Sequence, residues 1–390
     1  MGKKFGIGGN SIMLMLLLLL GAFLVAVPGT AIPPIWGLTI QSGDWTYTSG
    51  SPGVATITGY TGNGGAITIP SNLDGNTVTV IGQHAFNTDN GALITSVIIP
   101  SSVTYIDEMA FGFCTSLTSV TIPDSVTTIG VSAFFYCTHL TSVSIPNSVT
   151  TIGENAFGYC TLLTSITIPD SVTRIGNLAF TLCTHLTSVT IPNGVTTLEY
   201  DTFSYCKALT SVIIPNSIIS IGDRAFFECT NLTSVTIPNS VTTLGNYAFS
   251  TCTSLTSATI PDSVTTIGES AFSLCTKLTS VNIGSGVTAI DVYAFNGCTS
   301  LTSITFLGPT APIVVGDHWI DNTNSALAGH AYADSNFPAT GEDWYGLTMG
   351  DVLPEPTILS DVSTMLYLAV GIVAVAVVIA VVVVLIRKKK

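Results

Sequence analysis

A repeat of 23 residues governs most of this 390-residue chain. Phenylalanine returns nine times at one phase without a gap, and an earlier copy ends at Phe86. A fixed period in the twenties is typical of solenoids, in which each coil buries its core only against its neighbours. The sequence therefore predicts one stack of coils. The nine positions are Phe111, Phe134, Phe157, Phe180, Phe203, Phe226, Phe249, Phe272 and Phe295.

One coil runs from Leu117 to Cys137, and its order of residues predicts its local structure. Apolar and hydroxyl-bearing side chains alternate at its start, which indicates a strand. Pro123 ends that strand because proline lacks the N–H that a continuing ladder needs, and the Asp or Asn after it suits a turn. A second short extended piece over 126–129 is expected next. After Gly130 we expect a short helical or 3₁₀ segment.

The coil has a predicted inward set that stacks into columns. Parallel ladders place each residue about 4.8 Å from its copy in the next coil. Each buried Phe stabilises the stack by roughly 1.5–3 kcal/mol, so the Phe column is a principal source of stability. The inward set is Leu117, Val120, Ile122, Val126, Ile129, Ala133, Phe134 and Cys137, and the columns include Phe134, Phe157 and Phe180 beside Cys137, Cys160 and Cys183.

All nine cysteines share one repeat phase, from Cys114 to Cys298. Adjacent copies point the same way and stand too far apart at Cβ for good disulfide geometry. We therefore predict buried free thiols that act as small apolar residues. A metal site needs clustered Cys pairs or converging His, which the chain does not offer, and no cofactor is expected.

The two ends of the chain predict export and anchoring. Residues 1–31 have the layout of a secretory signal peptide, with two lysines, an apolar run and small residues near Ala31. Residues 365–386 form an uncharged stretch long enough for a transmembrane helix, and 387–390 are a basic tail. The basic tail predicts a single-pass type I protein in the cell membrane, with the repeats outside.

Charge narrows the class of partner. Between the two ends stand four basic residues and 23 acidic ones, so the formal charge is near −19. A nucleic-acid partner is disfavoured by this balance. Because the acidic residues are scattered, solubility and repulsion between molecules explain them without a dedicated cation site.

Two surfaces are candidates for binding. The first is the strand face, where Thr and Ser recur in every coil, and three interpretations stay open: strand propensity with solubility, a binding face, or a regular array that binds ice. The second is the edge before each Cys, where tyrosines vary between coils. The first set is Thr118, Ser119, Thr121, Thr141, Ser142, Thr164, Ser165, Thr187, Ser188, Thr233 and Ser234, and the second is Tyr136, Tyr159 and Tyr205.

Catalysis is not expected from this sequence. No nucleophile elbow, zinc-protease helix or phosphate loop is present, and the five histidines have no catalytic setting. A pocket around His330 and Trp344 would revive that possibility. Asn231 begins a lone N-glycosylation sequon, which is a weak signal.

The repeat resembles the BspA-like leucine-rich repeat family over about residues 66–306. The resemblance lies in the strand Leu-x-x-Val-x-Ile and in its continuation Ile-Pro-x-Ser-Val-x-x-Ile-Gly-x-x-Ala-Phe-x-x-Cys, with flanking segments at 55–70 and 329–349. It implies a leucine-rich-repeat solenoid with a parallel β-sheet on one face and short helical or 3₁₀ turns. It also implies surface display and adhesion to proteins, without naming the ligand.

These observations predict the following organisation and role. Residues 32–80 form an N-terminal β cap, 81–306 the repeats, 307–351 a closing module and 352–364 a stalk before the membrane helix. The predicted function is adhesion or recognition of protein or cell-envelope ligands through the solenoid surface. The alternative is a structural coat or spacer protein with no specific ligand. The sequence does not fix the oligomeric state.

Overall fold

The computed structural model describes residues 38–354 of the chain. The predicted signal peptide, transmembrane helix and basic tail, at 1–31, 365–386 and 387–390, lie outside the described residues, as does most of the stalk. Within 38–354, no helix has both the length and the apolar character needed to cross a membrane.

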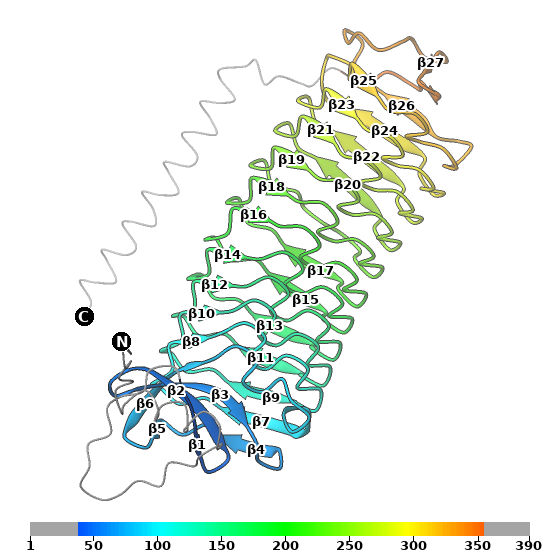
Figure 1. The fold of residues 1–390 in the computed structure, drawn as a ribbon. Coiled ribbons are helices and arrows are strands. Elements are labelled where there is room, and N and C mark those ends of the chain that lie inside the picture. Colours follow the sequence, from blue (N-terminus) through cyan, green and yellow to red (C-terminus); the bar gives the residue numbers. More distant parts are fainter. Residues whose placement is uncertain (1–37, 355–390) are drawn as a thin grey trace, which may run out of the picture.

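The described chain is a parallel β-solenoid of about 12 turns, as the repeat predicts. Two rows of short strands run along it, and Figure 1 shows the coils between the two caps. The first row is β4 (Gly65–Thr68), β7 (Ile94–Ile98), β9 (Ser119–Thr121), β11 (Ser142–Ser144), β13 (Ser165–Thr167), β15 (Ser188–Thr190), β17 (Ser211–Ile213), β20 (Ser257–Ile260), β22 (Ser280–Ile283), β24 (Ser303–Phe306) and β26 (Ala328–His330).

The second row corresponds to the second extended piece of each coil and is mostly two residues long. Proline and a turn separate it from the first row, so the chain changes direction between the two sheets. It consists of β6 (Asn76–Ile81), β8 (Tyr105–Ile106), β10 (Thr128–Ile129), β12 (Thr151–Ile152), β14 (Arg174–Ile175), β16 (Thr197–Leu198), β18 (Ser220–Ile221), β19 (Thr243–Leu244), β21 (Thr266–Ile267), β23 (Ala289–Ile290) and β25 (Val314–Val315).

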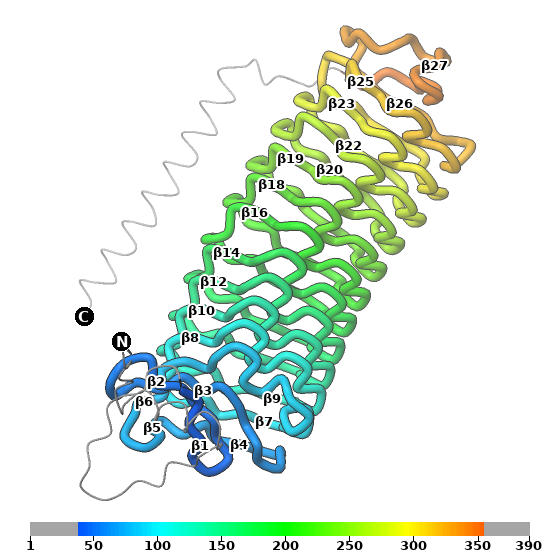
Figure 2. Tube along the Cα trace, in the orientation of Figure 1, coloured from blue at the N-terminus to red at the C-terminus, as the bar shows by residue number. Residues whose placement is uncertain are grey.

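The register between coils is one full repeat. Ser119 pairs with Ser142, and Thr128 pairs with Thr151. The rows are divided into several hydrogen-bonded sheets: the ladders are interrupted between β13 and β15 and between β14 and β16, and residues 232–238 form no regular strand. Figure 2 shows that the trace continues its stacking through these places.

Both caps join the solenoid by strand pairing. At the N-terminal end β1 (Thr39–Ser42), β2 (Trp45–Ser51) and β3 (Val54–Tyr60) are antiparallel, β3 then pairs in parallel with β6, and β5 (Asn72–Leu73) pairs with β6. At the other end β25 and β26 extend the two rows, and β27 (Asp343–Trp344) pairs with β28 (Leu347–Thr348). Parallel stacking therefore begins before residue 81 and continues past residue 306.

The short helical or 3₁₀ segment expected after Gly130 is not formed. Within 38–354 the only helix is the 3₁₀ turn η1 (Gly91–Leu93). In the coil segments, two residues four apart, such as Ser132 and Tyr136, have φ of 52° and 60°. These left-handed residues break any helix and turn the N–H groups of 132, 134 and 136 toward the next coil, where carbonyls accept them at 2.7–2.9 Å. We call the segments equivalent to 131–136 the left-handed edge.

The predicted inward set is confirmed by burial. All eight of its members are at most 8% exposed in the coil 117–137. The phenylalanines from Phe86 to Phe295 lie ring over ring, with centroids 4.7–5.7 Å apart and planes within 10°. Trp45 meets the first ring edge-on at 6.1 Å, and Trp319 meets the last at 6.2 Å. Aromatic rings of the caps thus cover both ends of the column.

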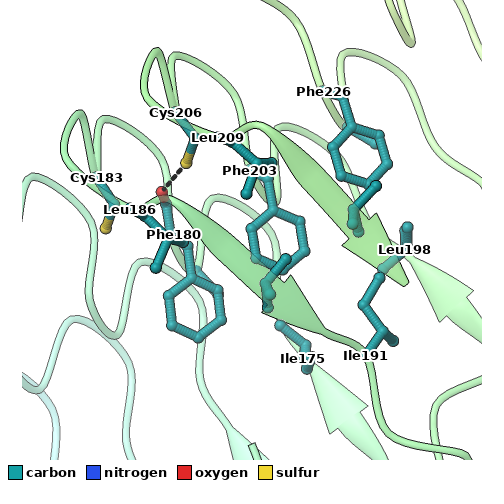
Figure 3. Close-up of a cluster of buried hydrophobic side chains, with 14 of the residues drawn as sticks. Ile175, Phe180, Cys183, Leu186, Ile191, Leu198, Phe203, Cys206, Leu209 and Phe226 are labelled. Carbon is teal, nitrogen blue, oxygen red and sulfur yellow. Dashed lines mark hydrogen bonds between the residues drawn. The ribbon is translucent and has the colours of Figure 1, made fainter. Parts of the chain in front are cut away.

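All nine cysteines are free and buried, as predicted. Each thiol also donates a hydrogen bond to the carbonyl of a Phe in the coil before it, as Cys206 does to Phe180 at 3.2 Å (Figure 3). Burial raises the pKa of Cys206 to about 12, because the thiolate would have no water around it. The thiol column therefore supplies packing and a weak contact between coils.

Removing one ring from the Phe column should destabilise the fold strongly. Phe157→Ala leaves a cavity between two stacked rings, so we expect a loss of about 3–5 kcal/mol in the free energy of unfolding. Guanidinium titration followed by circular dichroism measures it. The control is Val131→Ala, which alters an exposed side chain and should change stability by less than about 0.5 kcal/mol. Equal effects of the two would show that the rings do not form the core.

Alkaline pH should destabilise the fold through the thiols. Unfolded cysteines ionise near pH 9, whereas buried Cys206 keeps its proton until about pH 12. The unfolded state therefore binds fewer protons in this window, and the free energy of unfolding falls as pH rises through it. Denaturant midpoints measured across these pH values test this, with Cys206→Ala expected to reduce the slope. Reaction of native thiols with a disulfide reagent at neutral pH would contradict the burial.

Candidate recognition surfaces

The first candidate surface is the sheet face, which consists of residues 117–122 and their equivalents. It carries no charged residue in any coil from 94–99 to 301–306. Val120 and Ile122 point inward, while Thr118, Ser119 and Thr121 are exposed, as the strand pattern predicts. The structure therefore places the predicted Thr and Ser residues together on one uncharged face.

The Thr118 row is already engaged in holding the coils together. Each of its hydroxyls donates a hydrogen bond to the backbone carbonyl of the Thr at the same phase in the coil before it, at 2.9–3.4 Å. The same carbonyl also accepts the backbone N–H of the Thr whose hydroxyl it binds. The Thr141 carbonyl, for example, accepts the Thr164 N–H at 3.1 Å. The row thus has a structural role that explains its identity in every coil.

Three further hydroxyl rows make the same kind of contact outside the sheet face. Ser125 and its equivalents donate to carbonyls at 2.5–2.7 Å. Members of the Thr127 and Thr138 rows donate at 3.1–3.4 Å. In contrast, Ser119, Thr121 and their copies make no side-chain hydrogen bond within residues 38–354. An array that orders water would have to rely on these rows, because the Thr118 donors are occupied.

The second candidate surface is the left-handed edge, where the predicted Tyr136 and Tyr159 belong to an exposed aromatic cluster. Phe113 meets Phe135 edge-on at 5.4 Å, and Phe135 meets Tyr159 edge-on at 5.3 Å. Tyr136 contacts Phe113 and Tyr159 at 5.4 and 5.7 Å. Phe113 and Tyr136 are 41% and 38% exposed, so this cluster presents rings to solvent across three coils.

The predicted Tyr205 lies apart from that cluster and takes part in a clamp around Arg224. The guanidinium stands 4.3 Å from the Phe227 ring centre, its Nε donates to the Asp201 carboxylate at 3.0 Å, and a terminal nitrogen donates to the Tyr205 hydroxyl at 3.4 Å. Burial acts to lower the pKa of Arg224, but the hydrogen bond and charge of Asp201 outweigh it and the pKa is raised. The guanidinium is therefore firmly charged.

The remaining predicted positions are separate from both surfaces. Asn231 is exposed at its turn, which leaves the sequon accessible. A hollow of about 370 Å³ in the closing module is lined by residues 318–325, 327 and 345–348, and not by His330 or Trp344. In its wall His318 contacts Asp321 at 2.7 Å. Among residues 38–354 no three His, Cys, Asp or Glu side chains gather as metal ligands would.

Comparison with protein families matches residues 79–210 and 199–315 to the BspA type leucine rich repeat region, in six copies. This chain belongs to that family. The matched residues contain the sheet face, the left-handed edge and both columns. A comparison with curated proteins finds no match.

Several solved structures are similar to this chain. A leucine-rich repeat protein from Bacteroides ovatus is 26% identical to this chain. The alignment covers 82% of this chain and 100% of the other, with a TM-score of 0.50. The pneumococcal vaccine antigen PcpA is 19% identical over 83% of this chain and 89% of its own, with a TM-score of 0.56, which shows a shared fold. A Treponema pallidum leucine-rich repeat protein is 30% identical, and the alignment covers 55% of this chain and 90% of the other, with a TM-score of 0.46.

The sequence analysis did not single out four residues of the left-handed edge. Phe113 and Phe135 complete the aromatic cluster, and the run Phe134, Phe135, Tyr136 was the available signal, since only one of these faces inward. Asp201 and Arg224 form the clamp because they stand one repeat apart at the same phase. A search for opposite charges separated by 23 residues finds this pair.

Loss of one hydroxyl from the Thr118 row should lower the free energy of unfolding by a small but measurable amount. Thr164→Val removes the bond to the Thr141 carbonyl, which keeps its backbone donor, so we expect a loss of about 0.5–1.5 kcal/mol. The matched control is Ser165→Ala, one residue away on the same face and without a side-chain bond among residues 38–354, which should be close to neutral. Denaturant titration compares the two. Identical stabilities would remove the structural explanation of the row.

Proposed function

We propose that this chain is a cell-surface protein that recognises and adheres to other proteins through its left-handed edge. The observation that carries the proposal is the exposed cluster of Phe113, Phe135, Tyr136 and Tyr159. Clustered aromatic side chains dominate binding energy at protein interfaces. They also lose little conformational entropy when they are fixed by a partner.

Two differences between the surfaces favour the edge over the sheet face. The sheet face is uncharged and nearly the same in every coil, with Ile98, Ile213 and Asn282 as the main departures at the Thr121 phase, and its Thr118 row is bonded internally. The edge differs from coil to coil and carries rings and carboxylates, which are the groups that give selective contacts. Selectivity among partners therefore fits the edge better.

The proposed location rests on the sequence of the ends. The signal-like segment 1–31 and the apolar segment 365–386 with its basic tail support a type I membrane protein with the solenoid outside. The proposed role requires binding without chemistry and without a cofactor. Ligands would be proteins or envelope components of a neighbouring cell or matrix.

A structural coat or spacer is the second candidate. It is favoured by the near identity of the coils and by hydroxyl rows devoted to coil-to-coil contacts. A spacer needs length and rigidity only, so no substitution on the edge would alter its role. This difference separates the two candidates by experiment.

Saturable binding is expected of the purified solenoid, residues 32–351, on whole cells or matrix. Phe113→Ala combined with Tyr136→Ala should weaken this binding by about tenfold or more, since truncating central aromatics typically costs 2 kcal/mol or more. Fluorescently labelled protein in a titration series provides the measurement.

The control replaces the sheet face at the same coils, with Ser119→Lys, Ser142→Lys and Ser165→Lys, whose hydroxyls make no hydrogen bond within residues 38–354, and should leave binding largely unchanged. If the lysine variant loses binding and the aromatic variant keeps it, the contact belongs to the sheet face. Binding that never saturates supports the spacer and contradicts the proposal.

A further inference from the structure

The clamp around Arg224 shows how this edge holds an arginine. Its guanidinium lies over Phe227, next to Tyr205, and pairs with Asp201. Tyr205 and Phe227 come from successive coils and meet edge-on at 5.3 Å and 82°. A planar guanidinium suits such a site because it stacks on a ring while its N–H groups reach an acceptor.

The exposed aromatic cluster repeats this geometry without an arginine. Phe113 and Phe135 occupy the same phases as Tyr205 and Phe227, and they meet at 5.4 Å and 81°. Ser132 stands at the phase of Arg224, and Met109 stands at the phase of Asp201. The backbone is also equivalent, since φ is 52° at Ser132 and 56° at Arg224. The short Ser132 side chain carries no group that reaches over Phe135 as Arg224 reaches over Phe227. The cluster differs from the clamp in one further ring, because Tyr159 meets Phe135 edge-on where the clamp has Thr251.

Charge on the edge favours a cationic occupant. The left-handed edge carries one basic residue, Arg224, which is already paired with Asp201. Its acidic residues include two exposed carboxylates near the cluster, Glu108 and Glu154, which directly precede Met109 and Asn155. Glu108 accepts a hydrogen bond from Gln83 at 3.1 Å, and both carboxylates give this part of the edge a negative charge that attracts a guanidinium. The whole sheet face, in contrast, offers no charge.

We infer that the cluster of Phe113, Phe135, Tyr136 and Tyr159 binds an arginine side chain of a basic segment in the partner protein. This inference deepens the proposed function and rests on it, because it names the chemistry of the partner. The arginine occupies over Phe135 the place that Arg224 occupies over Phe227. A lysine binds less well, because its ammonium cannot stack as a plane.

The probe is a short peptide of alternating Gly and Arg, compared with the same peptide built on Lys. Titration into the full-length chain in detergent, followed by calorimetry at low salt, should show several-fold tighter binding of the Arg peptide. The decisive variant is Ser132→Arg with Met109→Asp, which rebuilds the clamp within the chain and leaves both rings in place. It should weaken binding of the Arg peptide by about tenfold, since the ring face is then occupied.

A matched control places the same charge elsewhere on the edge. Tyr293→Arg stands at the phase of Ser132, but the flanking positions hold Leu274 and Asn296 instead of rings. It should leave binding of the Arg peptide nearly unchanged, and Ser132→Arg alone, with the same charge, should weaken it. Thermal melting of each variant establishes that the solenoid is intact.

Three outcomes overturn the inference: equal affinity for the two peptides, no binding of either, or equal losses in Ser132→Arg and Tyr293→Arg. The binding titration on cells or matrix distinguishes failure of this inference from failure of the proposed function. If the variant Met109→Asp with Ser132→Arg still binds cells saturably, the proposed recognition stands, but an arginine of the partner is not the contact. Absence of saturable binding to cells rejects the proposed function itself.

Discussion

Hydrogen bonding between coils in strict register is the constraint on which this molecule depends. Strand N–H groups, the hydroxyls of the Thr118, Ser125, Thr127 and Thr138 rows, the thiols and alternate N–H groups of the left-handed edge find their acceptors one coil away. A coil alone would leave these groups without partners, and its apolar side chains would stay in water. One period of 23 residues satisfies all of them at once. This is why substitutions are rare at the phases that bond or pack.

The same constraint divides the surface into two kinds. Where side chains support the stack, as in the Thr118 row, identity is enforced in every coil. The left-handed edge meets its backbone needs mostly with main-chain bonds, although Asp223 and Asn246 accept N–H groups of the next coil with their side chains. Most of its outward side chains are therefore free to vary. Rings, carboxylates and one arginine have gathered there. The way in which the backbone N–H groups are hydrogen-bonded thus leaves one surface free for selective contacts.

The repeat phase was enough to predict the Phe and Cys columns, the inward set and the parallel stack, since each depends on a pattern of 23. The left-handed residues were not predictable by the usual rule, because Ser132, Tyr136 and their copies are not glycines, apart from Gly297. Their strain is offset by the bonds to the next coil, which only the fold reveals. Of the site, Tyr136 and Tyr159 were found from variation between coils. Phe113 and Asp201 needed the three-dimensional neighbourhood.

Interchangeable interfaces have an evolutionary consequence. Because every internal coil presents to its successor the surface that it meets on its predecessor, duplication or loss of a 23-residue unit leaves both caps with compatible neighbours. Each such event would change the rod by about 4.8 Å, and an event between the two sites would alter the separation of the aromatic cluster from the Arg224 clamp. Reach and spacing can therefore diversify by recombination within the array, without new packing having to be selected.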